Sequence, residues 1–108
     1  MTAKKVYIAG PITGVKGYAD RFKRAEQILE EAGHEPVSPV IPGDDEGETY
    51  RHYIDRGFRL LMGCDAICML PGWRRSRGAM LEKRYAETVK LPVYFIDTKY
   101  EAVRGPLL

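Results

Sequence analysis

A chain of 108 residues is long enough to bury one hydrophobic core but too short for two, so we expect a single domain spanning residues 1–108. Its 17 lysines and arginines against 15 aspartates and glutamates leave a formal net charge of +2, which gives no global reason to expect a nucleic-acid or membrane partner. No apolar run approaches the roughly 18 residues of a transmembrane helix, and the N-terminus lacks a signal peptide's hydrophobic core, so we expect a cytoplasmic protein.

The first expected strand is Val6–Ala9, and a turn rich in glycine, Gly10–Gly14, follows it. Glycines at the end of a strand let backbone N–H groups approach a phosphate or a ribose, helped by the N-terminus of the next helix. Glycine and proline after a strand can equally form a plain turn. Tyr7 is expected in the core, although its hydroxyl lies close enough to the strand's end to reach a crevice there.

The next segment, from about residue 18 to residue 32, has the spacing of an amphipathic helix, with apolar residues at Phe22, Ala25, Ile28, Leu29 and Ala32. Gly33 is the expected C-terminal stop. Residues 34–40 are expected to form a short edge strand because they contain two prolines, and His34 is expected in solvent at the helix end. The acidic segment 41–48 is either a solvated loop or a mobile flap over a site.

A second helix is expected from residue 49 or 50 to about residue 64. One face would carry the apolar residues and Gly57, and the opposite face would carry Asp55 and other charged side chains. We therefore expect Asp55 in solvent, and Asp65, which joins this helix to the next strand, as a structural turn residue. Cys64 and Cys68 have no further partners for a zinc set, so we expect free thiols and no metal site.

The stretch from Asp65 to Glu82 organises the chain. Ala66–Leu70 is a short apolar run without alternation, which is typical of a central strand buried on both faces. A basic loop follows, and then a helix over residues 79–90. At about 100° per residue, Glu82 falls near the middle of an apolar arc that comprises Ala79, Leu81, Tyr85, Ala86 and Val89. A carboxylate there lies near the crevice where open α/β sheets bind ligands, or else it is an exposed first-turn residue that interacts with the helix dipole.

A last strand is expected at Leu91–Ile96, and the remaining residues, 97–108, would form a weak helix at most. The alternation of strands and helices predicts an α/β fold: a flavodoxin-like (Rossmann-like) parallel sheet of four to five strands in the order 2-1-3-4(-5), with helices on both faces. In that order the turn after Tyr7 and the loop before Glu82 meet at the switch between the first and third strands.

Three segments, VYIAGPITG, CDAICMLPGW and SRGAMLEKRYA, together resemble the nucleoside 2-deoxyribosyltransferase and nucleotide N-glycosidase superfamily, and especially its small phage and bacterial branch, usually described only as a domain of unknown function. The resemblance runs from about residue 6 to residue 96. It implies an enzyme that cleaves or transfers at the N-glycosidic bond of a deoxynucleoside or its 5′-monophosphate, with Glu82 as the nucleophile and Tyr7 orienting it. It also implies a phosphate site formed by Gly10, Ile12, Thr13, Gly14, Ser76 and Gly78.

Charge and shape add further candidates in the basic loop. The guanidinium groups of Arg74, Arg75 and Arg77 favour an anion beside the glycine turn, or form a solvated loop. The Trp73 ring stacks on the base, or else it plugs the surface or a subunit contact. We expect a small-molecule nucleoside or nucleotide as the ligand, a homo-oligomer, no cofactor, no stable nucleic-acid partner and no membrane.

Gly57 departs from the pattern of the resembling enzymes. These commonly carry a second carboxylate eight residues before the aspartate at the strand start, and that residue here is Gly57. A catalytically inactive nucleotide-binding or interaction module of the same fold is therefore the alternative, and a nucleic-acid-binding protein that uses the basic loop is a third hypothesis. The departure also predicts that Gly57→Asp restores part of the proton chemistry. The sequence does not decide between transferase and hydrolase, between nucleoside and nucleotide, or between bases.

Overall fold

The computed structural model describes residues 4–40 and 50–107, so the acidic segment expected as a loop or flap lies outside the described residues. Within the described residues the chain forms five strands, β1 (Lys5–Ala9), β2 (Glu35–Val37), β3 (Ala66–Met69), β4 (Val93–Ile96) and β5 (Val103–Leu107). It also forms three α-helices, α1 (Tyr18–Glu31), α2 (Tyr50–Met62) and α3 (Arg77–Thr88), and a 3-10 turn at Trp73–Arg75. None of the helices in this described part is long and apolar enough to cross a membrane.

The strands form a sheet in the order β2-β1-β3-β4-β5, and the first four are parallel. This is the flavodoxin-like α/β arrangement that the sequence predicts, with the proline-containing β2 at an edge. The end of the chain differs from the prediction, because it forms a strand antiparallel to β4 instead of a weak helix. Asp97 stabilises the reversal: its carboxylate accepts hydrogen bonds from the backbone N–H groups of Glu101 and Ala102 at 2.7 and 3.0 Å.

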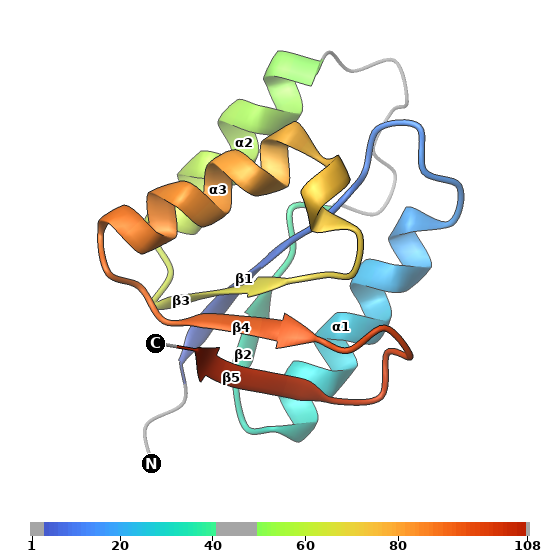
Figure 1. The fold of residues 1–108 in the computed structure, drawn as a ribbon, viewed down its shortest axis with the longest axis vertical. Coiled ribbons are helices and arrows are strands. Elements are labelled where there is room, and N and C mark those ends of the chain that lie inside the picture. Colours follow the sequence, from blue (N-terminus) through green and yellow to red (C-terminus); the bar gives the residue numbers. More distant parts are fainter. Residues whose placement is uncertain (1–3, 41–49, 108) are drawn as a thin grey trace.

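The helices lie in two layers, with α2 and α3 over one face of the sheet and α1 over the other (Figure 1). Successive side chains of a strand point to opposite faces. β1 therefore contributes Val6 and Ile8 to the core under α1, and Tyr7 and Ala9 to the core under α2 and α3. Every residue of β3 is buried, as expected for a central strand covered on both faces.

The loops that follow β1 and β3 meet at the carboxyl edge of the sheet, because these two strands are parallel neighbours. The backbone N–H of Leu70 donates to the carbonyl oxygen of Ala9 at 2.9 Å and ties the two strand ends together. A Cβ atom on Gly10 would lie 2.8 Å from the Cβ of Leu70. Glycine is therefore the residue that fits at this close approach without displacing Leu70.

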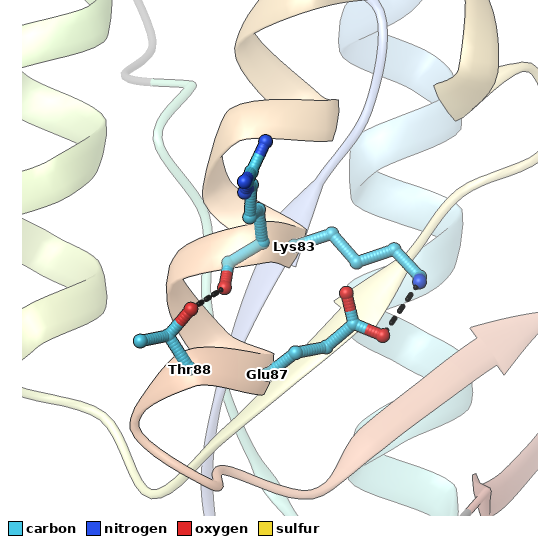
Figure 2. Close-up of polar contacts among 4 residues, drawn as sticks. Lys83, Glu87 and Thr88 are labelled. Carbon is cyan, nitrogen blue, oxygen red and sulfur yellow. Dashed lines mark hydrogen bonds and ion pairs between the residues drawn. The ribbon is translucent and has the colours of Figure 1, made fainter.

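The buried face of α3 differs from the apolar arc predicted for it. The residues of α3 that are buried are Gly78, Ala79, Glu82 and Ala86. Leu81 and Val89, which were expected in the core, are 50% and 47% exposed. Small side chains let α3 lie close to the sheet, so Leu81 and Val89 point outward, whereas Tyr85 packs partly buried against the core. Elsewhere on α3, Lys83 and Glu87 form a 3.1 Å ion pair, and the Thr88 hydroxyl donates to a backbone carbonyl oxygen of the preceding turn at 2.7 Å (Figure 2).

His34 is half-buried, which corrects the expectation that it is solvated. Its backbone N–H donates to the carbonyl oxygen of Leu29 at 2.9 Å, and its ring lies against Tyr94 with the ring centroids 5.4 Å apart. Its Nδ1 atom is buried and has no hydrogen-bond partner among the described residues. The local pattern marks the end of α1, but it does not show that β4 lies behind that end.

Candidate active site

Tyr7 from β1 and Glu82 from α3 form a buried pair at the centre of the candidate site. The Tyr7 hydroxyl donates a hydrogen bond to Oε2 of Glu82 at 2.6 Å, and the two residues are 1% and 6% exposed. In the described part of the chain, Glu82 is the single charged residue that is buried. Because an ionisable group is rarely buried this far without a partner, the pair marks a place where the fold tolerates a cost in stability.

The burial of the pair changes how both groups titrate. It raises the pKa of Glu82 from 4.5 to about 7, and the hydrogen bond from Tyr7 partly offsets that increase. Burial, and next the Glu82 carboxylate, hold the pKa of Tyr7 well above its ordinary value. Tyr7 therefore remains the proton donor while Glu82 titrates near neutral pH. A carboxylate of this kind is suited to act as a nucleophile or a general base at physiological pH.

The backbone of α2 covers the pair at Gly57, which is buried. A Cβ atom on Gly57 would lie 2.5 Å from Oε2 of Glu82 and 2.6 Å from the Tyr7 hydroxyl oxygen. We therefore correct the expectation that Gly57→Asp restores a carboxylate, because a side chain there would displace Glu82 and Tyr7, and a second carboxylate would also repel Glu82. The predicted helix register holds, since Gly57 faces the pair while Asp55 lies outward in an exposed 3.5 Å ion pair with Arg51.

An open cavity of about 850 Å³ lies beside the pair, bordered by the loops after β1 and β3 and by α2. Apart from Trp73 and Arg74, it is lined by all the residues predicted for the site: Tyr7, Gly10, Ile12, Thr13, Gly14, Arg75, Ser76, Arg77, Gly78 and Glu82. Residues far apart in the sequence meet here because the two loops leave the same edge of the sheet. The volume is in the range of small-molecule binding sites.

Trp73 lies outside this cavity. Its ring packs against Phe95 with the centroids 6.3 Å apart, and the cationic ends of Arg74 and Lys83 lie 4.7 and 4.9 Å from its centroid. The ring lines a smaller cleft of about 350 Å³ at the ends of β3 and β4. This position does not support stacking of Trp73 on a base beside Glu82, and it agrees with the alternative in which Trp73 plugs the surface.

The N-terminus of α3 opens into the cavity, with Ser76, Arg77 and Gly78 in its lining. Ser76 is the N-cap, and its Oγ accepts a hydrogen bond from the backbone N–H of Ala79 at 3.1 Å. The first N–H groups of a helix lack partners within the helix and form the positive end of its dipole. The start of α3 is therefore a favourable place for an anion.

Four cationic side chains of the described residues line the cavity, and two of them were not predicted from the sequence. Lys16 follows the glycine turn and Arg21 lies in the first turn of α1, whereas Arg75 and Arg77 come from the basic loop. Among the described lining residues, Glu82 is the only acidic one. The small net charge of the chain conceals this local excess. The sequence contained a signal for both residues, because Lys16 and Arg21 come soon after the Gly10–Gly14 turn, which was already placed at the switch point.

Tyr53 of α2 also lines the cavity, although its place in the helical pattern gave it no role beyond the apolar face. The guanidinium of Arg56 lies 5.3 Å from the centroid of its ring. Arg56 is half-buried, not on an outer face as the helical pattern indicated, and it donates to the carbonyl oxygen of Pro39 at 2.9 Å. Tyr53 therefore supplies an aromatic wall to the cavity, and Arg56 joins α2 to the segment after β2.

No metal site is evident in the part of the chain that the structure describes. Its histidine, cysteine, aspartate and glutamate side chains form no group of three or more that could hold a metal ion. Cys64 and Cys68 are free thiols, as expected. The groups that the cavity offers to a ligand are Glu82, Tyr7, the hydroxyls of Thr13 and Ser76, and the cationic side chains.

The fold and the cavity define a flavodoxin-like α/β protein with a buried carboxylate at its β1–β3 switch. A profile of the family described as "Domain of unknown function (DUF4406)" matches residues 4–95, so the chain belongs to that family. A search of curated protein sequences finds no match.

A solved structure with a similar fold is the 2-deoxyribosyltransferase from Bacillus psychrosaccharolyticus, described as a biocatalyst for nucleoside synthesis. The two proteins share 20% sequence identity with a TM-score of 0.63, and the match covers 84% of this chain and 70% of the transferase. At this level of identity the similarity establishes a shared fold.

Proposed function

We propose that this chain cleaves the N-glycosidic bond of a deoxynucleoside 5′-monophosphate, with Glu82 as the nucleophile. The observation that carries the proposal is the buried Glu82 carboxylate, which is hydrogen-bonded to Tyr7 at 2.6 Å and borders a cavity lined by four cationic side chains. The similar fold of a 2-deoxyribosyltransferase supports the class of reaction.

The proposed chemistry has two steps. Loss of a base develops positive charge on the sugar, which a carboxylate beneath the anomeric carbon stabilises. A Glu82 oxygen bonds to C1′ as the C1′–N bond breaks, and the electron pair of that bond leaves with the base, which takes a proton from water. Water then attacks C1′, which frees the Glu82 carboxylate and releases 2-deoxyribose 5-phosphate and a proton. A second base in place of this water would give transfer instead of hydrolysis.

In this mechanism Tyr7 orients the nucleophile. Its hydroxyl binds Oε2 of Glu82, which leaves Oε1 to react with the sugar. The same hydrogen bond lowers the pKa of Glu82 against the effect of burial, so that a larger fraction of the carboxylate is ionised at neutral pH. Tyr7 thereby keeps a buried group available as a nucleophile.

The cationic lining favours a phosphorylated substrate over a nucleoside. Lys16, Arg21, Arg75 and Arg77 line the cavity together with the first residues of α3. A phosphate monoester carries a charge of about −1.5 to −2 at neutral pH, whereas a nucleoside is neutral. Guanidinium groups and helix N-termini both bind phosphate well. The hydroxyl groups of Thr13 and Ser76 lie in the same lining and are suited to bind the phosphate oxygens.

Binding of a nucleotide without chemistry is the second candidate function, and one observation favours it. The α2 residue that covers Glu82 is Gly57, so α2 offers no second carboxylate there to move protons at the leaving base. A nucleotide-binding module would keep the cationic cavity and would release no base.

Incubation of the purified chain with each deoxynucleoside and its 5′-monophosphate separates these functions, when released base and sugar phosphate are measured by chromatography. We expect base release from at least one monophosphate, and none from the same monophosphate with Glu82→Gln. Glu87→Gln is the matched control, because Glu87 lies on the same helix in an exposed ion pair with Lys83 and should keep full activity. Stoichiometric nucleotide binding with no released base would establish the second function instead. Addition of a different free base distinguishes transfer from hydrolysis.

A further inference from the structure

We propose that Gly57 is a positioning residue for Glu82: the missing side chain lets the α2 backbone close over the Tyr7–Glu82 pair and hold the carboxylate in its reactive place. This inference rests on the proposed role of Glu82 as the nucleophile. It reverses the interpretation of Gly57 as a site that has lost a functional side chain.

The contacts around Gly57 support a requirement for glycine. A Cβ atom at this position would fall 2.5 Å from Oε2 of Glu82 and 2.6 Å from the Tyr7 hydroxyl oxygen, both well inside van der Waals contact. Two atoms of the same hydrogen bond would be displaced together. At Gly63, just after α2, the nearest atom to such a Cβ is the carbonyl oxygen of Leu60 at 3.6 Å, an ordinary contact.

The position of Gly57 within α2 leads to the same conclusion. Glycine is among the least favourable residues inside a helix because of its backbone freedom, and Gly57 lies well inside the 13-residue helix α2. Its conformation does not demand glycine, because its φ is not in the left-handed region. The close approach of the pair is therefore the feature of the structure that favours glycine here.

The consequence for the site is a carboxylate confined on three sides. Tyr7 holds Oε2 from the sheet, α3 carries the residue, and Gly57 closes the side toward α2. A methyl group at position 57 would move the carboxylate off Tyr7 and toward the cavity, away from its place beneath the anomeric carbon. Positioning to within about 1 Å decides the rate of such reactions, since small misplacements cost about a hundredfold.

The test compares Gly57→Ala with Gly63→Ala as the matched control. For Gly57→Ala we expect kcat to fall about a hundredfold or more, while KM for the nucleotide stays within about threefold, because the cationic lining is unchanged. Gly63→Ala should leave both constants at their wild-type values. Unchanged kcat in a folded Gly57→Ala chain would overturn the proposal.

A second readout does not depend on activity. The pKa of Glu82, followed by carbon NMR on chain labelled at the glutamate carboxyl carbon, should fall from about 7 toward 4.5 in Gly57→Ala, because the carboxylate moves toward the open cavity and loses its burial. Tyr7→Phe should move the same pKa upward, since it removes the hydrogen bond that lowers it. The opposite directions separate displacement from simple loss of the hydrogen bond. If the wild-type chain proves inactive, an unchanged Glu82 titration in Gly57→Ala still refutes the positioning role.

A third variant covers the case in which Gly57→Ala does not fold. In a Glu82→Ala background the carboxylate is gone, so the Tyr7 hydroxyl, which also lies 2.6 Å from the added methyl group, can shift into the vacated space. Alanine also favours the helix. Gly57→Ala should then lower the urea midpoint strongly in the natural chain and hardly at all in the Glu82→Ala background, a non-additive result. Equal losses in both backgrounds, or a double variant that does not fold, would show that Gly57 serves general helix packing and would overturn the proposal.

Discussion

The two faces of the sheet are built from different chemistry. Under α1, Phe22, Ile28 and Leu29 pack with apolar side chains of β1 and β3 in a core without a buried charge among the described residues. Under α2 and α3, β1 contributes Tyr7, which lies next to Ile8 in the strand but points to the opposite face. The Tyr7 hydroxyl donates a hydrogen bond to the carboxylate of Glu82. Both faces are stabilised by hydrophobic burial, but the α2–α3 face also accepts the cost of burying an ionisable group.

A single step along β1 therefore separates a stabilising residue from one of the candidate site. Ile8 and Tyr7 are both almost fully buried. Ile8 packs in the apolar core under α1, whereas Tyr7 forms the hydrogen bond to the buried carboxylate of Glu82. Changes on the α1 face should lower stability and leave the chemistry of each folded molecule intact. Removal of the Glu82 charge on the α2–α3 face should abolish the chemistry and leave stability unchanged or higher.

The largest effect is expected for Glu82→Gln on the α2–α3 face. Loss of the nucleophile should reduce base release about a thousandfold or more, because the amide cannot form the bond to C1′. At pH 8 the free energy of unfolding should be unchanged or higher, since an amide avoids the cost of burying a charge. Chromatography of released base measures the loss of activity, and urea unfolding measures the free energy of unfolding. A variant that unfolds, or that turns over at the wild-type rate, contradicts the assignment.

The opposite behaviour is expected for Leu29→Ala on the α1 face. Leu29 is 0% exposed, so removal of its side chain leaves a cavity and should lower the free energy of unfolding by about 3 kcal/mol. The rate per folded molecule should not change. Glu30→Ala, one residue along on the exposed side of α1, is the control and should stay near wild type in both measurements. A lower rate per folded molecule in Leu29→Ala would mean that the two faces of the sheet are coupled.

The pH dependence of stability sharpens the comparison further. The pKa of Glu82 is about 7 in the folded chain against an ordinary value of 4.5, so between these pH values the folded state binds more protons than the unfolded state. The free energy of unfolding should therefore fall as the pH rises from about 4.5 through about 7, by up to roughly 3 kcal/mol in all. The stability that proton binding by Glu82 contributes is fully present below about pH 4.5 and is lost as the pH rises through about 7.

Urea unfolding at a series of pH values measures this effect. Glu82→Gln should remove the decrease, because glutamine does not titrate. Leu29→Ala should keep the decrease and shift the whole curve downward. A wild-type curve that is flat between pH 4.5 and pH 7.5 would show that the Glu82 pKa is not raised in the folded chain.

Much of this arrangement could be predicted from local sequence patterns. The alternation of strands and helices and the prolines of β2 are local signals, and they predicted a sheet order that is confirmed. Parallel strands bring the loops at their carboxyl ends together, which is why Tyr7 and Glu82 could be expected near each other before any distance was known.

The features that escaped prediction depend on packing between elements. Leu81 points outward because α3 approaches the sheet through smaller residues, which a helical wheel does not reveal. Trp73 turns away from the cavity because the 3-10 turn directs it toward Phe95. Gly57 looked like a missing carboxylate in the sequence, and only the distances to Tyr7 and Glu82 show that a side chain at this position would displace the pair.

The smallest expected effect concerns the cationic lining of the α2–α3 face. Arg77 is exposed and lines the cavity at the start of α3, so its interaction with a phosphate is screened by water. Arg77→Ala should raise KM for the deoxynucleoside 5′-monophosphate about five- to tenfold, which corresponds to roughly 1 kcal/mol. Arg84→Ala, exposed on the same helix and outside the cavity lining, is the control. The decisive comparison is between substrates: KM for the matching nucleoside should not change, because it carries no phosphate. Equal increases for both substrates would mean that Arg77 contacts the base or sugar, and the phosphate would then have to be bound by Lys16, Arg21 and Arg75.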